Sequence, residues 1–221
     1  TSGEPLFKRG FKREASAASM KENLAAGLLL LSGWDPATPL MDPMCGAGTI
    51  LIEAADMALH RAPGRARHFA FEHYRDFDAA RWQAIKDAAR AEELPLKPLP
   101  IFGADNDRWV LDKAQNNLAA AGYAEVVALL DADVTALEPP LPAGTVVSNP
   151  PYGERIGDVD DLIDWYPLLG DWMKKRLAGW DVWLISGDPA LPRTLGLKAS
   201  RKIPLFNGQI ETRFLHYRMI A

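Results

Sequence analysis

Residues 149–155, Asn-Pro-Pro-Tyr-Gly-Glu-Arg, are the part of the chain whose chemistry is most informative. A polar residue followed by two prolines and an aromatic ring makes a short loop that can grip an amino group attached to a nucleobase. Residues 143–148 lead into this loop from Gly144 through a β-branched trio, which predicts a buried strand. The loop is therefore expected at the carboxyl end of a strand, where open α/β sheets bind their ligands. In the purely structural alternative, the prolines end the strand and Tyr152 fills the core.

Residues 42–49, Asp-Pro-Met-Cys-Gly-Ala-Gly-Thr, form a second candidate loop, between a predicted strand and a predicted helix. Small residues and backbone amides at such a turn let a nucleotide-like ligand approach closely. The loop is not a phosphate-binding P-loop, because no Gly-Lys-Ser/Thr follows it. It is also a poor dinucleotide fingerprint, because Leu51 stands at the third glycine position. A close-packing turn without a ligand is the structural alternative.

Acidic residues follow two further predicted strands. Asp105 ends the second strand, where a carboxylate can take both hydroxyls of a ribose, and Asp133 follows the third, where it can accept a hydrogen bond from an adenine amino group. Asp105 or Asp107 could instead cap the next helix. Acids at three consecutive strand ends, together with the Gly-x-Gly loop, favour a site for a nucleoside that carries a cationic or polar tail.

Apolar periodicity predicts seven strands and several helices around these loops. The strands are expected at residues 39–42, 101–105, 126–131, 145–149, 181–186, 198–206 and 210–220. The helices are expected at residues 49–59, 78–93, 108–121 and 162–177, near Leu191, and from a capping box at Ser19 and Glu22 to about Leu31. The alternation predicts an α/β fold with a doubly wound, mostly parallel, Rossmann-like seven-stranded sheet. The turn Asn207-Gly208 adds an antiparallel hairpin at its edge.

The composition favours one compact domain of a cytoplasmic protein. The chain has 221 residues, of which 48% are hydrophobic, so it can bury one sizeable core, and its longest apolar run, residues 24–31, is too short to cross a bilayer. A single cysteine, Cys45, excludes an internal disulfide framework, and no cationic leader is evident. We expect a basic linker segment at residues 1–18 and a catalytic domain at residues 19–221, with an insertion at about residues 60–98.

The net charge of −4 means that a nucleic acid would have to bind local basic patches. Residues 1–21 and residues 60–75 each carry a net charge of +3. A solvated surface is the alternative explanation. The candidate RNA contacts are Lys8, Arg9, Lys12, Arg13, Arg61, Arg65, Arg67 and Arg155.

The combined motifs resemble a known family. The order of residues 42–49, then Gly103-Ala104-Asp105, then residues 131–134 and then residues 149–155 is similar to the class I S-adenosylmethionine-dependent methyltransferases. With residues 2–12 and the start of the first helix, the chain resembles over nearly its whole length the bacterial large-subunit (23S) ribosomal RNA guanine-N2 methyltransferases. In that family an RNA-binding THUMP domain normally precedes the catalytic domain, and some members carry a second methyltransferase half. Neither is found in these residues, so we expect an excised catalytic domain. Ala47 stands where serine is frequent in the family.

This resemblance implies the cofactor, the partner and the site. The cofactor is S-adenosylmethionine, with no metal, and the partner is large-subunit ribosomal RNA or an assembly intermediate. The implied cofactor-binding residues are Asp42, Pro43, Cys45, Gly46, Gly48, Thr49, Asp105, Asn106, Asp133, Val134 and Asn149. The implied catalytic residues are Asn149, Pro150, Pro151 and Tyr152.

The implied reaction is direct methyl transfer to the N2 amine of a guanine. The Asn149 side-chain oxygen and the Pro150 carbonyl can accept the two amine hydrogens, and Tyr152 can stack on a flipped base. No covalent intermediate is needed, so Cys45 is expected to be a small loop residue. Arg155 is expected to contact a phosphate or to pair with a neighbouring acid such as Glu154.

Other targets and classes stay open on the sequence alone. The loop also tolerates adenine N6 in DNA or RNA and a transfer RNA guanine, and a non-catalytic RNA-binding module could keep the same fold. A nicotinamide oxidoreductase is disfavoured by the glycine pattern. The four histidines lack metal-ligand spacing, and the seven tryptophans fall mostly at helix or strand positions, which favours packing.

Overall fold

The computed structural model describes residues 3–11, 20–151 and 159–220, and it contains one seven-stranded sheet. The strand order is β3-β2-β1-β4-β5-β7-β6. The strands are β1 (Leu40–Asp42), β2 (Ile101–Asp105), β3 (Ala128–Asp131), β4 (Gly144–Ser148), β5 (Trp180–Ser186), β6 (Arg201–Asn207) and β7 (Ile210–Arg218). The first five strands are parallel. The doubly wound, mostly parallel sheet predicted from the sequence is confirmed.

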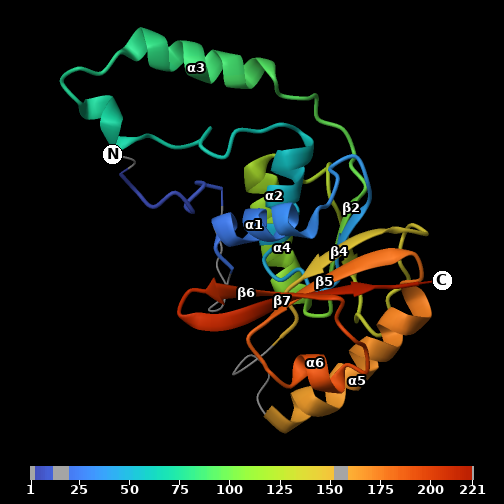
Figure 1. Cartoon of the computed structure of the whole chain (residues 1–221). Helices are drawn as coiled ribbons and strands as arrows, with labels where there is room; N and C mark the ends of the chain where they lie inside the picture. Colours follow the sequence, from blue (N-terminus) through green and yellow to red (C-terminus); the bar gives the residue numbers. More distant parts are fainter. Residues whose placement is uncertain (1–2, 12–19, 152–158, 221) are drawn as a thin grey trace.

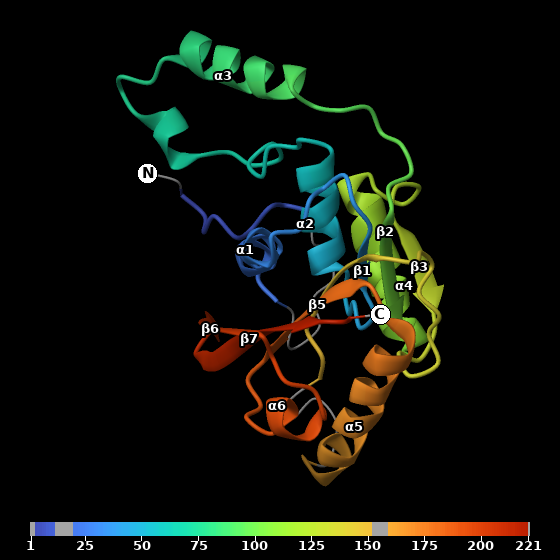
Figure 2. The same ribbon diagram turned by 45° about the vertical axis from the view of Figure 1, so that its right-hand side comes forward.

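Helices cover both faces of this sheet, as Figures 1 and 2 show. One face carries α1 (Glu22–Ser32), α2 (Thr49–Ala58) and α4 (Arg108–Ala121), whose apolar residues share a core with one side of the sheet. The other face carries α5 (Val159–Arg176) and α6 (Leu191–Thr194), which build the second core. Strand residues alternate between the two cores: Val147 lies in the first and Val146 in the second. Because every parallel strand ends on the same edge, the loops that carry the candidate residues gather there.

The antiparallel hairpin at the sheet edge is also confirmed. β7 pairs with both β5 and β6, and Gly208 takes a φ of 66° in the turn between β6 and β7. That left-handed backbone is what an Asn-Gly hairpin turn requires. In Figure 1 the hairpin, coloured red, projects from the left side of the body, away from the end of the chain marked C.

Element ends differ slightly from the prediction. α1 ends before Gly33, which takes the left-handed conformation. The predicted capping box at Ser19 and Glu22 is wrong, because α1 begins at Glu22 with Lys21 as its N-cap and no side-chain capping hydrogen bond; Ser19 itself lies outside the described residues. β3 begins at Ala128 because Val126 and Val127 donate to the Tyr123 carbonyl in a turn, despite their β-branched side chains.

The segment predicted as an insertion, residues 60–98, forms an arm. It contains the short helix η1 (Ala70–His73) and α3 (Ala79–Ala91), and none of the residues of α3 is buried. Trp82 of α3 packs edge-on against Phe69 and Phe71, with ring centroids 5.6 and 5.0 Å apart. In both Figure 1 and Figure 2, α3 stands apart from the sheet. Among the described residues, no helix is long and apolar enough to cross a membrane.

Candidate active site

Three hydrogen bonds link predicted site residues and Ser148 along the carboxyl edge of the sheet, and we call this group of residues the rim. The Ser148 hydroxyl at the end of β4 donates to Asp42 Oδ1 at the end of β1, at 2.6 Å. The Gly46 amide donates to Asp105 Oδ2 at the end of β2, at 3.0 Å. Asn106 Nδ2 in turn donates to Asp133 Oδ2, at 3.1 Å. The structure therefore brings together residues that follow or end β1, β2, β3 and β4, although these strands are far apart in the sequence.

Backbone geometry explains the glycines of residues 42–49. Gly46 and Gly48 have φ values of 54° and 79°, in the left-handed region that favours glycine. The Cys45 amide donates to the Ala104 carbonyl and Asn117 Nδ2 donates to the Ala47 carbonyl, so the loop is fixed from both sides. Apart from Gly46 and its two chain neighbours, no atom of the described part of the chain lies within 4 Å of where a Gly46 side chain would start, which leaves room for a ligand at this point.

Burial gives Asp42 unusual electrostatics. Its side chain is 2% exposed, and burial raises its pKa to about 7, although the Ser148 hydroxyl and the Met44 amide oppose that rise. Burial also raises the pKa of Asp105. In contrast, the hydrogen bond from the Thr135 hydroxyl lowers the pKa of Asp133. A cation placed beside Asp42 would favour its charged form, so the site suits a ligand with a positively charged group.

The thiol of Cys45 is not prepared for nucleophilic attack. It is 7% exposed, and burial raises its pKa well above the ordinary value for a thiol. A buried thiol with a raised pKa is a poor nucleophile. This environment agrees with the expectation that Cys45 is a packing residue of the loop.

The Asn149 side chain presents an unused acceptor. Its Oδ1 atom is buried and has no hydrogen-bond partner among the described residues. Leaving such an acceptor unsatisfied costs about 1 to 3 kcal/mol, so a buried unpaired oxygen points to a donor that a ligand supplies. The next residues, Pro150 and Pro151, leave β4 at the same edge of the sheet.

Two residues that the sequence analysis missed, Tyr166 and Asp188, form a hydrogen bond beside Pro151. The Tyr166 hydroxyl of α5 donates to Asp188 Oδ2 at 2.8 Å and lies 3.5 Å from the Pro151 carbonyl. Ser148, the partner of Asp42, was missed as well. Asp188 follows β5 closely, so an acid at one more strand end was a usable signal, whereas nothing in the pattern of α5 marks Tyr166.

Four of the arginines predicted to contact RNA are engaged within the domain. Arg9 makes two hydrogen bonds to Glu53, at 3.1 and 3.2 Å, and Arg65 makes two to Asp56, at 2.9 and 2.7 Å. Arg67 donates to the Pro5 carbonyl at 3.0 Å, and Arg61 pairs with Glu93. Lys8 forms an exposed pair with Glu4. The remaining predicted residues, Lys12, Arg13, Tyr152 and Arg155, lie outside the described residues.

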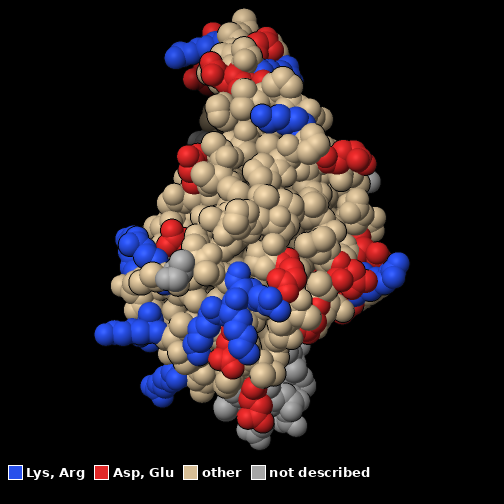
Figure 3. Space-filling model, turned by 90° about the vertical axis from the view of Figure 1, so that its right-hand side faces the viewer, with Lys and Arg blue, Asp and Glu red and all other residues tan. Residues whose placement is uncertain are grey.

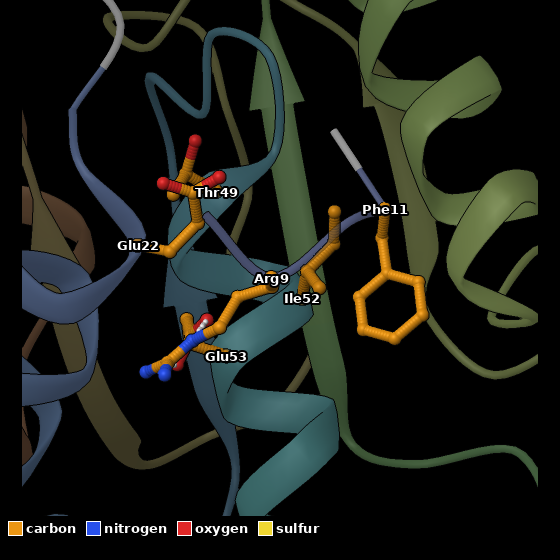
Figure 4. Close-up of a pocket in the computed structure, with 6 residues that line it drawn as sticks. All are labelled: Arg9, Phe11, Glu22, Thr49, Ile52 and Glu53. Atoms are coloured by element: carbon orange, nitrogen blue, oxygen red, sulfur yellow. Dashed lines mark hydrogen bonds and ion pairs between the residues drawn. The ribbon is translucent and has the colours of Figure 1, made fainter. Parts of the chain in front are cut away.

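These contacts attach residues 3–11 to α2. Glu53 and Asp56 are 3% and 4% exposed, and the Phe11 ring stacks on the Arg65 guanidinium at 4.3 Å. Figure 4 shows the small pocket between this segment and α2, in which Arg9 reaches toward Glu53. Its lining consists of Arg9, Phe11, Glu22, Thr49, Ile52 and Glu53. Arg9 of the first patch and Arg61 and Arg65 of the second patch are thus paired with acids of the same domain.

Exposed charge is segregated elsewhere on the surface. Figure 3 shows one face on which many Lys and Arg side chains gather toward the lower left and lower centre, while Asp and Glu side chains are spread over the top, the right and the bottom of the view. No group of three or more metal-ligating side chains occurs in the part of the chain that the structure describes.

The strand order and the loops at the carboxyl edge define an α/β methyltransferase fold. A family model described as "RMKL-like, methyltransferase domain" matches residues 9–216. The chain therefore belongs to this family of methyltransferase domains.

Individual relatives agree with that assignment. The chain is 42% identical over its whole length to a ribosomal RNA large subunit methyltransferase K/L of Shewanella baltica, and it spans about a third of that relative (32%). The solved structure of SMU.472, a putative methyltransferase complexed with SAH, superposes with a TM-score of 0.93 at 33% identity, covering all of this chain and 58% of that one. A predicted N6-adenine-specific DNA methylase from Listeria monocytogenes gives a TM-score of 0.89 at 32% identity, covering 99% of this chain and 56% of that one.

Proposed function

We propose that this chain transfers a methyl group from S-adenosylmethionine to the exocyclic N2 amine of a flipped guanine in large-subunit ribosomal RNA. The observation that carries the proposal is the buried Oδ1 of Asn149, which has no partner within residues 3–11, 20–151 and 159–220 and lies at the carboxyl edge, beside the hydrogen-bonded rim. The names of the curated relatives support ribosomal RNA as the substrate.

The cofactor fits the rim in a defined orientation. Asp42 and the backbone of Gly46 to Gly48 hold the methionine part, where Gly46 leaves space and the buried Asp42 carboxylate faces a cationic group. Asp105 takes the ribose hydroxyls and Asp133 the adenine amine, with Pro43, Cys45, Thr49, Asn106 and Val134 completing the site. The bound cofactor supplies an activated methyl group. The SAH in the SMU.472 structure supports a cofactor of this type.

Residues 149–155, which we call the acceptor loop, then orient the substrate. The N2 lone pair of guanine is delocalised into the ring, so the amine needs acceptors that relieve its developing positive charge. Asn149 Oδ1 and the Pro150 carbonyl accept its two hydrogens, and Tyr152 stacks on the base for about 1 to 3 kcal/mol. The raised pKa of Cys45 supports direct transfer without a covalent intermediate.

The test is Asn149→Ala with large-subunit RNA that lacks the modification. Losing one acceptor at a developing charge costs about 3 kcal/mol, so we expect kcat to fall on the order of a hundredfold. Calorimetry with S-adenosylhomocysteine is the control, and its affinity should change much less. Unchanged turnover by the variant would remove the proposed role of Asn149, and absence of cofactor binding by the wild type would favour a non-catalytic RNA-binding module.

The identity of the methylated base needs a separate experiment. Incubation with mixed RNA and DNA, followed by mass analysis of the nucleosides, should yield N2-methylguanosine in ribosomal RNA. Recovery of N6-methyladenine, the product that the name of the Listeria relative implies, would overturn the choice of guanine. A methylated transfer RNA guanine would overturn the choice of ribosomal RNA.

A further inference from the structure

The β6–β7 hairpin carries a concentrated positive charge. Between residues 198 and 218 the sequence has five Lys and Arg residues and one acid, which gives a net charge of +4 in a chain whose total is −4. All five basic residues are exposed: Lys198, Arg201, Lys202, Arg213 and Arg218. Two of them form only loose surface pairs, Arg213 with Glu211 at 3.5 Å and Arg218 with Asp181 at 3.8 Å.

Toward its turn, one face of the hairpin is exposed, whereas Leu215, opposite Lys202 on the same face, is buried in the second core. On β6 the residues Lys202, Pro204 and Phe206 are exposed, while Ile203 and Leu205 between them pack against the core. Arg213 of β7 pairs with Pro204 and therefore points to the same side as Phe206. Phe206 is 67% exposed, which leaves most of an apolar aromatic ring in water.

The strand register places this face beside the acceptor loop. Ser148 pairs with Leu184, so Pro150, two residues later, leaves β4 level with Ser186, and Ser186 pairs with Arg213. Arg213 therefore lies two strand spacings from Pro150, about 10 Å away. Phe206 pairs with Glu211, two residues further toward the hairpin tip and one strand further out, about 15 Å from Pro150.

The hairpin is suited to a nucleic acid rather than to an added strand or an apolar partner. Pro204 lies on the edge strand and lacks an amide hydrogen, so β6 is a poor template for another strand. One exposed aromatic ring among basic side chains is the combination that binds single-stranded nucleic acids: the ring stacks on a base and the cations neutralise phosphates.

The competing basic surfaces are less available. Arg9, Arg61, Arg65 and Arg67 are used in contacts within the domain, as described above. The basic last turn of α5, residues 174–176, lies at the end of a helix that starts near the carboxyl edge and runs away from it. Of these basic surfaces within the described residues, the hairpin is thus the one that adjoins the acceptor loop.

We propose that the β6–β7 hairpin binds the single-stranded RNA that flanks the methylated base, with Phe206 stacking on an unpaired base and Lys202 and Arg213 contacting phosphates. This inference rests on the proposed function, because it assigns the hairpin a role toward the same RNA. It gives the catalytic domain its own RNA-binding surface.

Binding of an unstructured single-stranded RNA oligonucleotide tests the inference, measured by fluorescence anisotropy with S-adenosylhomocysteine present. Phe206→Ala should weaken binding roughly 5- to 100-fold, the range expected for one lost stacking contact. The double variant Lys202→Gln/Arg213→Gln should lower the slope of log affinity against log salt by about 1.4, because each lost phosphate contact on single strands contributes about 0.7. Neither change should alter the affinity for S-adenosylhomocysteine.

Matched controls come from the arm. Tyr74 is a 50% exposed aromatic residue, and Arg90 forms an exposed pair with Asp87 that resembles the pair of Arg213 with Glu211. Tyr74→Ala and Arg81→Gln/Arg90→Gln should therefore leave RNA binding nearly unchanged.

Equal losses in the hairpin and control variants would overturn the inference, as would hairpin variants that bind RNA like the wild type. A changed oligomeric state in sedimentation with unchanged RNA binding would also overturn it and identify the face as a protein interface. The proposed function is tested independently, since Asn149→Ala should bind this RNA normally and fail in methylation.

Discussion

At the scale of single residues, Asp42 is a side chain whose protonation equilibrium the fold changes strongly. Its pKa of about 7 results chiefly from burial, and the Ser148 hydroxyl compensates only part of the cost. A buried, charged carboxylate lowers the stability of the ligand-free protein. The same charge raises the affinity for a cationic ligand, because that ligand stabilises it. Functional sites commonly carry such locally unfavourable groups.

We therefore predict that Asp42→Asn stabilises the apo protein at high pH. The folded state holds the Asp42 proton more tightly than the unfolded state, whose pKa is near 3.8, so its contribution lowers the free energy of unfolding as pH rises from about 4 to about 7. The free energy of unfolding of the variant, relative to that of the wild type, should be higher at pH 8 than at pH 5 by roughly 1 to 3 kcal/mol.

Urea unfolding at the two pH values measures this difference. Asp171→Asn, at an exposed surface pair, controls for the change in net charge. A stability gain that is equal at pH 5 and pH 8 would contradict the raised pKa, and cofactor binding that survives Asp42→Asn would contradict the proposed role of the carboxylate.

At the scale of elements, α5 and the turn after β5 support the start of the acceptor loop at Pro151. Tyr166 comes from the middle of α5, directly before Pro167, and Asp188 comes from the turn after β5. Their hydrogen bond joins two elements next to the Pro151 carbonyl. Burial and the neighbouring Asp188 carboxylate raise the pKa of Tyr166, so its hydroxyl stays a donor.

We predict that Tyr166→Phe lowers kcat several-fold, because the acceptor loop loses the contact of the Tyr166 hydroxyl. The affinity for S-adenosylhomocysteine should stay unchanged, because the rim loses no contact. The lost hydrogen bond should also cost about 1 to 2 kcal/mol of stability. Tyr217→Phe is a close control: Tyr217 is equally buried, but its hydroxyl has no partner among the described residues, so its removal should be neutral or stabilising. Equal effects of the two substitutions on kcat would argue against a positioning role.

The first segment of the chain is the second element-scale feature. Burial raises the pKa of Glu53 and the Arg9 guanidinium opposes that rise, so this ion pair holds residues 3–11 on α2. We predict that Arg9→Ala destabilises the protein by about 3 kcal/mol, because it leaves a buried carboxylate without its partner.

Chemical denaturation measures the cost, and the neighbouring Lys8→Ala provides the control. The pair of Lys8 with Glu4 is exposed, so its loss should leave the stability nearly unchanged. Glu53→Gln in the Arg9→Ala background should recover part of the loss by removing the stranded charge. An Arg9→Ala variant as stable as Lys8→Ala would show that the segment contributes little to the fold.

At the scale of the whole molecule, the sequence predicts the sheet and the gathering of the candidate residues at its carboxyl edge. Both follow from local rules, since strand-loop-helix alternation dictates a parallel sheet and parallel strands end on one edge. The acids Asp42, Asp105 and Asp133 and the glycine loop could thus be placed together before any coordinates were known.

The contacts between distant parts of the chain could not be predicted in this way. Arg9 and Glu53 are 44 residues apart, and Arg67 binds carbonyls 62 residues before it. A basic residue looks the same in the sequence whether its partner is a phosphate or a buried acid. The hairpin patch was overlooked for a related reason: its charges alternate with apolar residues along the strands, and only the sheet register brings them to one face.

The position of Cys45 gives the molecule a built-in probe. It is the one cysteine in the sequence, and it lies in the glycine loop with its thiol shielded and protonated. A thiol reagent can modify it only when this loop departs from its packed position. The labelling rate therefore reports the opening of the loop in the native protein, and protection by a ligand would locate that ligand on this loop without any engineered label.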